Sequence, residues 1–394
     1  MRRCCFGCVS VMAWSLAAGM ALAQSGALPP LLKTLQAVDR EGKGNRAASQ
    51  AWADLINQSD ASQLPTILAA MDDCGPLASN WLRAAVDTIA ERETKAKGKL
   101  PTSDLEAFLG DKQHHPRARR LAYEWITRSD PSAPDRLIPT MLNDPSLELR
   151  RDAVARELAA ADKSLGEKQT DQAVATYRVA MDSARDLDQV KAAAEALKKL
   201  DHPVNLTYHF GFLQDWKFLG PLANPQGKGF DIAYPLEKSL DLNNLLEPDG
   251  ELKWIAYHTD DEYGFVDLNK AIGKHKGALA YAVAEFQSEW PQPVELRLGS
   301  ENANKIWLNG ELISSANVYH ANGTMDQYVG RGKMKAGRNA IVLKICQNEQ
   351  TEDWAQDWKF QLRVCDSTGK AIHSTDRVAP RTAQLQNAKN AIQE

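Results

Sequence analysis

The spacing of apolar residues changes once along the chain, close to residue 200. Between Leu31 and Leu200, apolar side chains recur at intervals of three and four, which places them on one face of a helix. Short segments rich in Asp, Gly and Pro, such as 72–76 and 129–134, interrupt this spacing. The first half of the chain is therefore predicted to be a series of amphipathic helices.

After His202-Pro203 the pattern changes to short alternating runs separated by Gly, Pro, Asn and Asp, which is typical of an all-β sandwich. The predicted strands are 204–213, 216–220, 251–258, 263–268, 278–286, 294–300, 305–310, 311–314, 340–345 and 358–364. The chain is thus expected to be a multidomain α plus all-β protein, with a helical domain over 27–200 and an antiparallel sandwich over 204–378.

Asn309-Gly310 predicts a tight hairpin, because both central positions of a type I′ turn require positive φ. The expected pairs are Leu308 with Glu311, Trp307 with Leu312, and Ile306 with Ile313. Alternation then places Ile306 and Ile313 in the core, together with Trp358 and Phe360 of the last strand. The opposite face carries Trp307 and Leu312, which either form a docking patch or are covered by a long loop or by the helical half.

The N-terminus has the features of a cleavable secretory signal over residues 1–23. Arg2 and Arg3 precede an apolar run, and Ala21-Leu22-Ala23 offers a cleavage site after Ala23. A membrane anchor is the alternative, although the apolar run is shorter than a spanning helix needs. We expect a secreted or periplasmic protein without a stable membrane anchor, ending in a flexible tail over 379–394.

Charge and cysteine content limit the classes of function. The net charge is −4 with both signs mixed along the chain, which gives no basic footprint for nucleic acid. Removal of the signal would leave Cys74, Cys346 and Cys365. If 341–348 and 358–365 pair as a hairpin, Cys346 and Cys365 lie too far apart for a disulfide, so three thiols are expected.

Sequence motifs for catalysis, metal binding and cofactor binding are missing, so the prediction is a protein that is not an enzyme and needs no cofactor or metal. An enzyme with a site at the domain junction stays open as an alternative, since convergent carboxylates leave no motif. Asp260-Asp261-Glu262 could contribute oxygen ligands to Ca²⁺, but these residues lack an alternating acidic pattern. A solvated turn is the favoured interpretation of that loop.

Three segments of the helical half share a plan of short helix, turn and longer helix. They begin near Leu64, Asp104 and Leu137, with periods of about 41 and 33 residues, in the range of helical solenoids. Asp144-Pro145 followed by Arg150 resembles the second helix of a HEAT repeat, over about 45–162. The resemblance implies a scaffold that docks envelope proteins; an irregular helical bundle is the alternative.

The β half resembles the galactose-binding-like jelly roll, an accessory domain of many secreted bacterial glycoside hydrolases. The elements that carry this resemblance occur in order over 204–368: 216–221, the Trp254 strand, 281–286, 298–313 and 337–364. The resemblance implies binding of polysaccharide or glycoconjugate, alone or as part of a polysaccharide-degrading system, although no catalytic domain accompanies it.

Aromatic residues in polar loops are the candidates for sugar binding, because a ring can stack on the apolar face of a pyranose. Trp354 lies in the polar loop 349–358, and Tyr319 and His320 lie in another after the hairpin. Trp307 is the remaining candidate, on the second face of the hairpin. For Trp354, a packing lid is the alternative, and for the protein as a whole, a protein-interaction scaffold with a structural sandwich.

Overall fold

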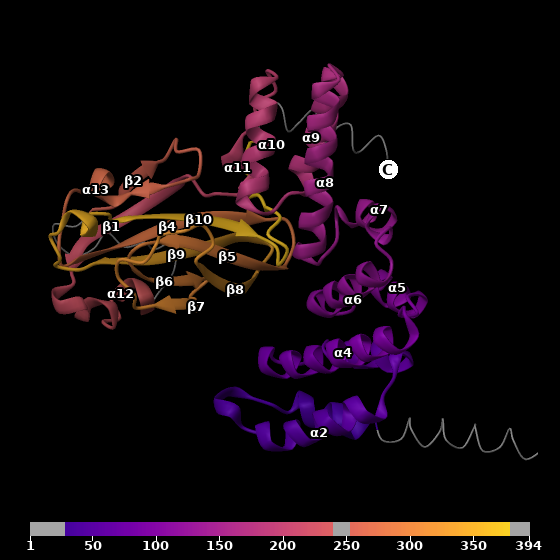
Figure 1. The fold of residues 1–394 in the computed structure, drawn as a ribbon. Coiled ribbons are helices and arrows are strands. Elements are labelled where there is room, and N and C mark those ends of the chain that lie inside the picture. The colour runs from indigo at the N-terminus through magenta and orange to yellow at the C-terminus, as the bar shows by residue number, and fades with distance from the viewer. Residues whose placement is uncertain (1–27, 239–252, 379–394) are drawn as a thin grey trace, which may run out of the picture. The chain divides into compact units, whose positions relative to one another are not determined.

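The computed structural model describes residues 28–238 and 253–378. The chain divides into two compact units between Gln189 and Val190, the first helical and the second a β-sandwich (Figure 1). The predicted signal over 1–23 and the predicted tail over 379–394 lie outside the described residues. None of the helices in the described ranges combines the length and the apolarity of a membrane span.

The first unit is built from helices that bury one apolar stripe each. Their bounds are α2 Asn45–Gln58, α3 Leu64–Ala69, α4 Pro76–Lys97, α5 Ser103–Gly110, α6 Pro116–Ser129, α7 Ala133–Leu137, α8 Leu147–Gly166 and α9 Thr170–Ser183. Pro76 and Pro116 stand in the first turns of their helices, where a missing N–H costs little. The buried faces include Leu55, Leu82 and Leu121, as the apolar spacing predicts.

A buried ion pair ties α6 to the turn before α8. Arg119 is fully buried, and its guanidinium donates to both carboxylate oxygens of Asp144, at 2.6 and 2.8 Å. It also donates to the carbonyl oxygen of Leu109, at the end of α5. Asp144 in turn accepts from the backbone N–H of Ser146. One side chain thereby links three consecutive segments of the unit.

The second unit consists of two antiparallel sheets that enclose one apolar core. The six-stranded sheet has the order β2 Ile255–His258, β1 Asp215–Ala223, β4 Ala278–Ser288, β9 Gly337–Gln347, β6 Ala303–Leu308 and β7 Glu311–Ala316. The four-stranded sheet has the order β3 Val266–Asp267, β10 Lys359–Cys365, β5 Gln292–Ser300 and β8 Tyr328–Met334. Trp358, Phe360 and Ile306 are fully buried between the sheets, as alternation predicts.

Helices accompany the strands in this unit. They are α10 Leu187–Lys199, which begins before the division, α11 Leu206–Phe210, α12 Pro235–Lys238 and α13 Leu268–Ala271. The predicted strand 204–213 is wrong, because its centre is α11. Asn205 caps that helix by accepting the N–H of Tyr208, and Gly211 ends it with a left-handed φ of 77°.

The predicted hairpin between 341–348 and 358–365 is also wrong. These segments form β9 and β10, which belong to different sheets, so Cys346 and Cys365 lie on opposite sides of the core. Both are free thiols, as is Cys74. The loop between β9 and β10 therefore crosses from one sheet to the other at the end of the sandwich.

The hairpin through Asn309-Gly310 follows the predicted register in part. Leu308 pairs with Glu311 and Trp307 with Leu312, but a bulge then pairs Ile306 with Ser314. Trp307 is only 5% exposed and belongs to a second apolar cluster, on the outer face of the six-stranded sheet. The interpretation of Trp307 as an exposed contact residue is therefore corrected: a loop covers it, whereas Leu312 remains 48% exposed.

The cover is the segment 225–238, which packs over that outer face. Phe230 packs in the same apolar cluster as Trp307. The fully buried Lys344 of β9 forms hydrogen bonds with this segment. The ammonium of Lys344 donates to the carbonyl oxygens of Phe230 and Ile232 and to the Glu237 carboxylate, at 3.1, 2.8 and 2.8 Å. A buried cation with three acceptors holds this loop on the sheet.

Candidate functional site

Trp354 is the most exposed of the predicted contact residues, at 60% of its surface. It lies on a single helical turn, Asp353–Ala355, within the loop that crosses from β9 to β10. The side chain of Gln356 donates to the carbonyl oxygens of Thr351 and Glu352, at 2.6 and 2.9 Å. These two hydrogen bonds connect the end of the turn to its start, and they restrict the backbone that carries the indole ring.

Two buried amides hold the same loop from inside the sandwich. Gln347 and Asn302 are both fully buried, and Asn302 Nδ2 donates to Gln347 Oε1 at 3.2 Å and to the carbonyl oxygen of Asp357 at 3.1 Å. Gln347 Nε2 donates to the carbonyl oxygen of Ala355 at 3.2 Å. Buried amides with several partners are costly to rearrange, so this network rigidifies the base of the loop.

His320 lies beside the Trp354 ring. The two rings meet edge to face, with centroids 4.8 Å apart and planes at 83°. Asn348 Nδ2 lies 2.9 Å from His320 Nε2 and 2.8 Å from Gln350 Oε1. As an amide nitrogen can only donate, Nε2 must accept, and this assigns the proton of the neutral imidazole to Nδ1.

Two hydrogen-bond donors that flank Asn348 are available to an external group, and one of them is on the His320 ring beside Trp354. Within residues 28–238 and 253–378, neither His320 Nδ1 nor Gln350 Nε2 has a hydrogen-bond partner. Both side chains are half-buried, which gives them fixed positions without closing them off from solvent. A flat ring with the His320 donor beside it can bind a ligand that has an apolar face and hydroxyl acceptors at its edge.

Tyr319 belongs to the same end of the sandwich but acts differently. Its hydroxyl accepts from Asn224 Nδ2 at 3.0 Å, and the same amide donates to the carbonyl oxygen of Gln347 at 3.1 Å. Burial raises the pKa of the Tyr319 phenol, so the hydroxyl stays neutral. The Asn224 amide, directly after β1, thus links the Tyr319 hydroxyl to the end of β9.

The structure therefore brings three of the four predicted residues, Trp354, His320 and Tyr319, to one end of the sandwich, while Trp307 lies under the segment 225–238. Trp354, His320, Asn348 and Gln350 are called the Trp354 group from here on. Sequence reasoning missed the amides, of which Asn348 bonds to both His320 and Gln350. One signal was available, since the polar run 348–350 follows directly on the apolar strand β9. Asn302 and Asn224 gave none, because their burial depends on the packing of distant segments.

The acidic loop 260–262 is a turn. The Asp261 carboxylate accepts the backbone N–H groups of Tyr263 and Phe265, at 2.9 and 3.1 Å, and Asp260 points to His258 at 3.4 Å. Among the residues that the structure describes, no group of three or more His, Cys, Asp or Glu side chains is placed to hold a metal ion.

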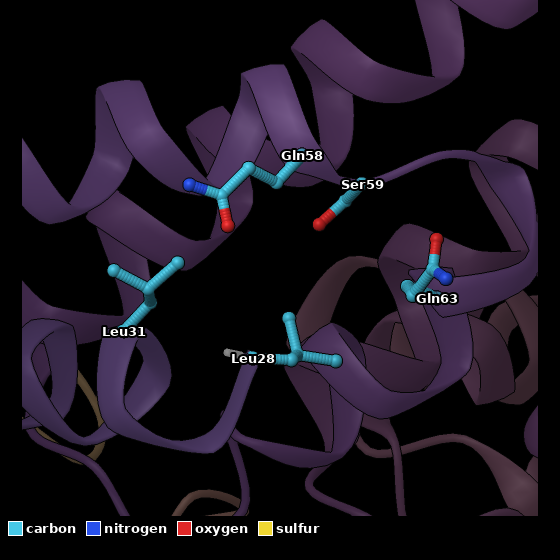
Figure 2. A pocket seen from close by; sticks show the side chains of 5 residues that line it. All are labelled: Leu28, Leu31, Gln58, Ser59 and Gln63. Atoms are coloured by element: carbon cyan, nitrogen blue, oxygen red, sulfur yellow. The ribbon is translucent and has the colours of Figure 1, made fainter. Parts of the chain in front are cut away.

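A small hollow in the helical unit is lined by Leu28, Leu31, Gln58, Ser59 and Gln63 (Figure 2). Its volume of about 10 Å³ is no larger than a single water molecule requires. This hollow is too small for an organic ligand.

No protein-family model matches the chain, and no curated protein matches it either. Among solved structures, the chain is similar to an anti-sigma factor domain-containing protein from Clostridium clariflavum, with 12% identity over 43% of this chain and 48% of that chain, at a TM-score of 0.26. It is also similar to β-glucosidase from Kluyveromyces marxianus in complex with glucose, with 12% identity over 45% of this chain and 18% of that chain, at a TM-score of 0.26. The chain spans less than half of either protein, and these likenesses carry no argument about its function.

Proposed function

We propose that this protein is an exported, non-catalytic carbohydrate-binding protein whose β-sandwich binds polysaccharide or glycoconjugate through the Trp354 group. The observation that carries the proposal is the exposed Trp354 ring on a loop fixed by the buried amides Gln347 and Asn302. An exposed ring on a mobile loop would lose conformational entropy on binding, and the amide network removes most of that cost in advance.

The finer fold assignment belongs to the same proposal. We infer a galactose-binding-like jelly roll from the order of its sequence elements, and the two antiparallel sheets around one core are compatible with it. We infer HEAT-like repeats in the first unit, with the buried Arg119–Asp144 pair as the link between successive repeats. Export rests on the signal-like sequence of residues 1–23.

A glycan array probed with the chain lacking residues 1–23 tests the proposal. We expect binding to at least one glycan, and we expect Trp354→Ala to weaken it by more than tenfold, because the stacking surface is lost. Trp290→Ala is the matched control: Trp290 is 55% exposed and follows the far end of β4, so its loss should change affinity less than about twofold. An array without any hit, or equal effects of the two substitutions, contradicts the proposal.

A protein-interaction scaffold is the second candidate, and one feature of the helical unit favours it. Arg83 of α4 pairs with Glu124 of α6 at 2.8 Å, and Arg120 of α6 pairs with Asp152 of α8. Successive long helices thus carry a continuous charged face that is partly exposed. If this face docks a protein, Arg83→Ala/Arg120→Ala should abolish cross-linking of the full chain to that partner, whereas Trp354→Ala should leave it unchanged.

A further inference from the structure

The Trp354 loop is acidic. Between Asn348 and Asp357 the chain carries four carboxylates and no Lys or Arg. Asp357 is paired with Lys359, but the other three, Glu349, Glu352 and Asp353, are exposed and form no salt bridge with any residue that the structure describes. Glu352 and Asp353 directly precede Trp354 in the chain, so two exposed carboxylates without a salt bridge in the described part of the chain adjoin the proposed stacking residue.

Lys276 contacts the loop and offsets only part of this charge. Lys276 Nζ donates to the carbonyl oxygen of Ala355, 2.7 Å away, and is directed at the base of the loop. Burial lowers the pKa of Lys276, and the negative charge of Glu352 opposes that shift, so this ammonium offsets part of the charge of Glu352. Lys359 is occupied by Asp357 and by Glu301.

Resting on the proposed function, we infer that the site selects by charge: it accepts neutral sugars and amino sugars and rejects uronate-containing or sulfated glycans. The Trp354 ring and the donors of His320 and Gln350 suit any pyranose face with hydroxyl groups. The carboxylates of Glu352 and Asp353 repel a bound anion and attract an ammonium group. In this proposal the carboxylates of Glu352 and Asp353 discriminate between neutral, amino and acidic glycans. The Trp354 ring provides most of the glycan affinity.

The test is a glycan array that contains neutral, amino and acidic glycans, at 20 mM and 300 mM NaCl. We expect hits among neutral and amino glycans, with amino-glycan signals falling at high salt because the attraction is screened. Glu352→Gln/Asp353→Asn should raise the acidic-to-neutral binding ratio by roughly two- to fivefold, as expected for removal of two solvent-exposed charges near the ligand. Neutral glycans should bind this variant as they bind the unaltered chain.

Glu289→Gln/Glu311→Gln is the matched control, since both carboxylates are exposed at the other end of the sandwich. It removes the same net charge and should leave the ratio unchanged. Acidic glycans among the strongest Trp354-dependent hits overturn the charge selection and leave the proposed function standing. An array without hits, or with hits that survive Trp354→Ala, overturns the proposed function, and the charge selection falls with it.

Discussion

The guanidinium of Arg119 is completely buried in the helical unit, and the carboxylate of Asp144 balances its charge. Removing the guanidinium leaves Asp144 charged and without its main partner in the interior, and the carbonyl of Leu109 loses two donors. We expect Arg119→Leu to lower the free energy of unfolding by about 3–5 kcal/mol, the range for breaking a buried pair from one side. Urea denaturation followed by circular dichroism measures this.

The comparison for Arg119 is Arg83→Leu. That side chain is 46% exposed in its pair with Glu124, and solvent screens such a pair, so the expected loss is about 0–1 kcal/mol. Similar losses in both variants would show that Arg119 is not stabilised by Asp144 in the way its geometry indicates.

His373 makes the stability of the sandwich depend on pH. Burial, reinforced by Arg377 and Lys370, lowers the pKa of its imidazole to about 4, and the ring stacks on Tyr208 at 3.9 Å. The unfolded chain takes up this proton near pH 6.5 and the folded chain only near pH 4, so stability is lost as the pH falls from 6.5 towards 4. The loss is about 3 kcal/mol at most, reached below pH 4.

His373→Phe keeps the stacking and removes the titration. Urea unfolding at pH 7.5 and pH 5.0 should show a loss for the unaltered chain that exceeds that of the variant by about 2 kcal/mol. If both proteins lose the same stability, His373 does not titrate with a lowered pKa.

At the scale of elements, the end of α11 depends on a glycine. Gly211 has a left-handed φ of 77°, and a Cβ there would lie 2.7 Å from the backbone oxygen of Val364, whose own N–H donates to the Gly211 carbonyl. Gly211→Ala therefore combines backbone strain with a clash that no side chain can relieve, and should cost about 3 kcal/mol or more.

Gly310→Ala isolates the backbone contribution. Gly310 has a φ of 89° in the hairpin turn and nothing within 4 Å of a Cβ, so only the left-handed strain of about 1 kcal/mol is expected. Thermal unfolding of both variants measures the difference. A Gly310 variant as unstable as the Gly211 variant would contradict the role of the Val364 contact.

The elements also show what local pattern can and cannot predict. Strands with a continuous or alternating apolar pattern, such as β4 and β9, could be predicted because each buries a face. The strand β8 was missed, because Gly330 and Gly332 occupy its inward positions; a Cβ at either would lie 2.8 Å from Ile313 or Leu308. At these two positions Ile313 and Leu308, which belong to other strands, supply the apolar side chains. The sequence of β8 itself therefore shows no alternating apolar pattern.

The candidate site divides in the same way. Trp354 and His320 could be proposed as site residues because aromatic rings within polar loops stand out in the sequence. Trp307 could not be assigned correctly, since its cover, the segment 225–238, lies far away in the chain and is held by the buried Lys344. The bulge that shifts Ile306 onto Ser314 likewise leaves no mark in an alternating sequence.

At the scale of the whole molecule, the two units separate two kinds of surface. The proposed sugar site lies entirely in the sandwich, and the charged face of α4, α6 and α8 lies entirely in the helical unit. We therefore expect the effects of Trp354→Ala and Arg83→Ala/Arg120→Ala to be additive, because substitutions in separate units that share no partner rarely couple. The triple variant should combine the glycan affinity of the first with the stability of the second.

Four proteins are compared: the unaltered chain, Trp354→Ala, Arg83→Ala/Arg120→Ala and the triple variant. Isothermal titration calorimetry with the strongest array glycan measures their glycan affinity, and urea denaturation measures their stability. Glycan affinity should differ less than about twofold between the unaltered chain and Arg83→Ala/Arg120→Ala, and unfolding should differ by less than about 0.5 kcal/mol between the unaltered chain and Trp354→Ala. A glycan affinity that falls severalfold when only the helical face is altered would mean that the helices contribute to the sugar site. The sandwich would then have to be regarded as one part of a composite binding surface.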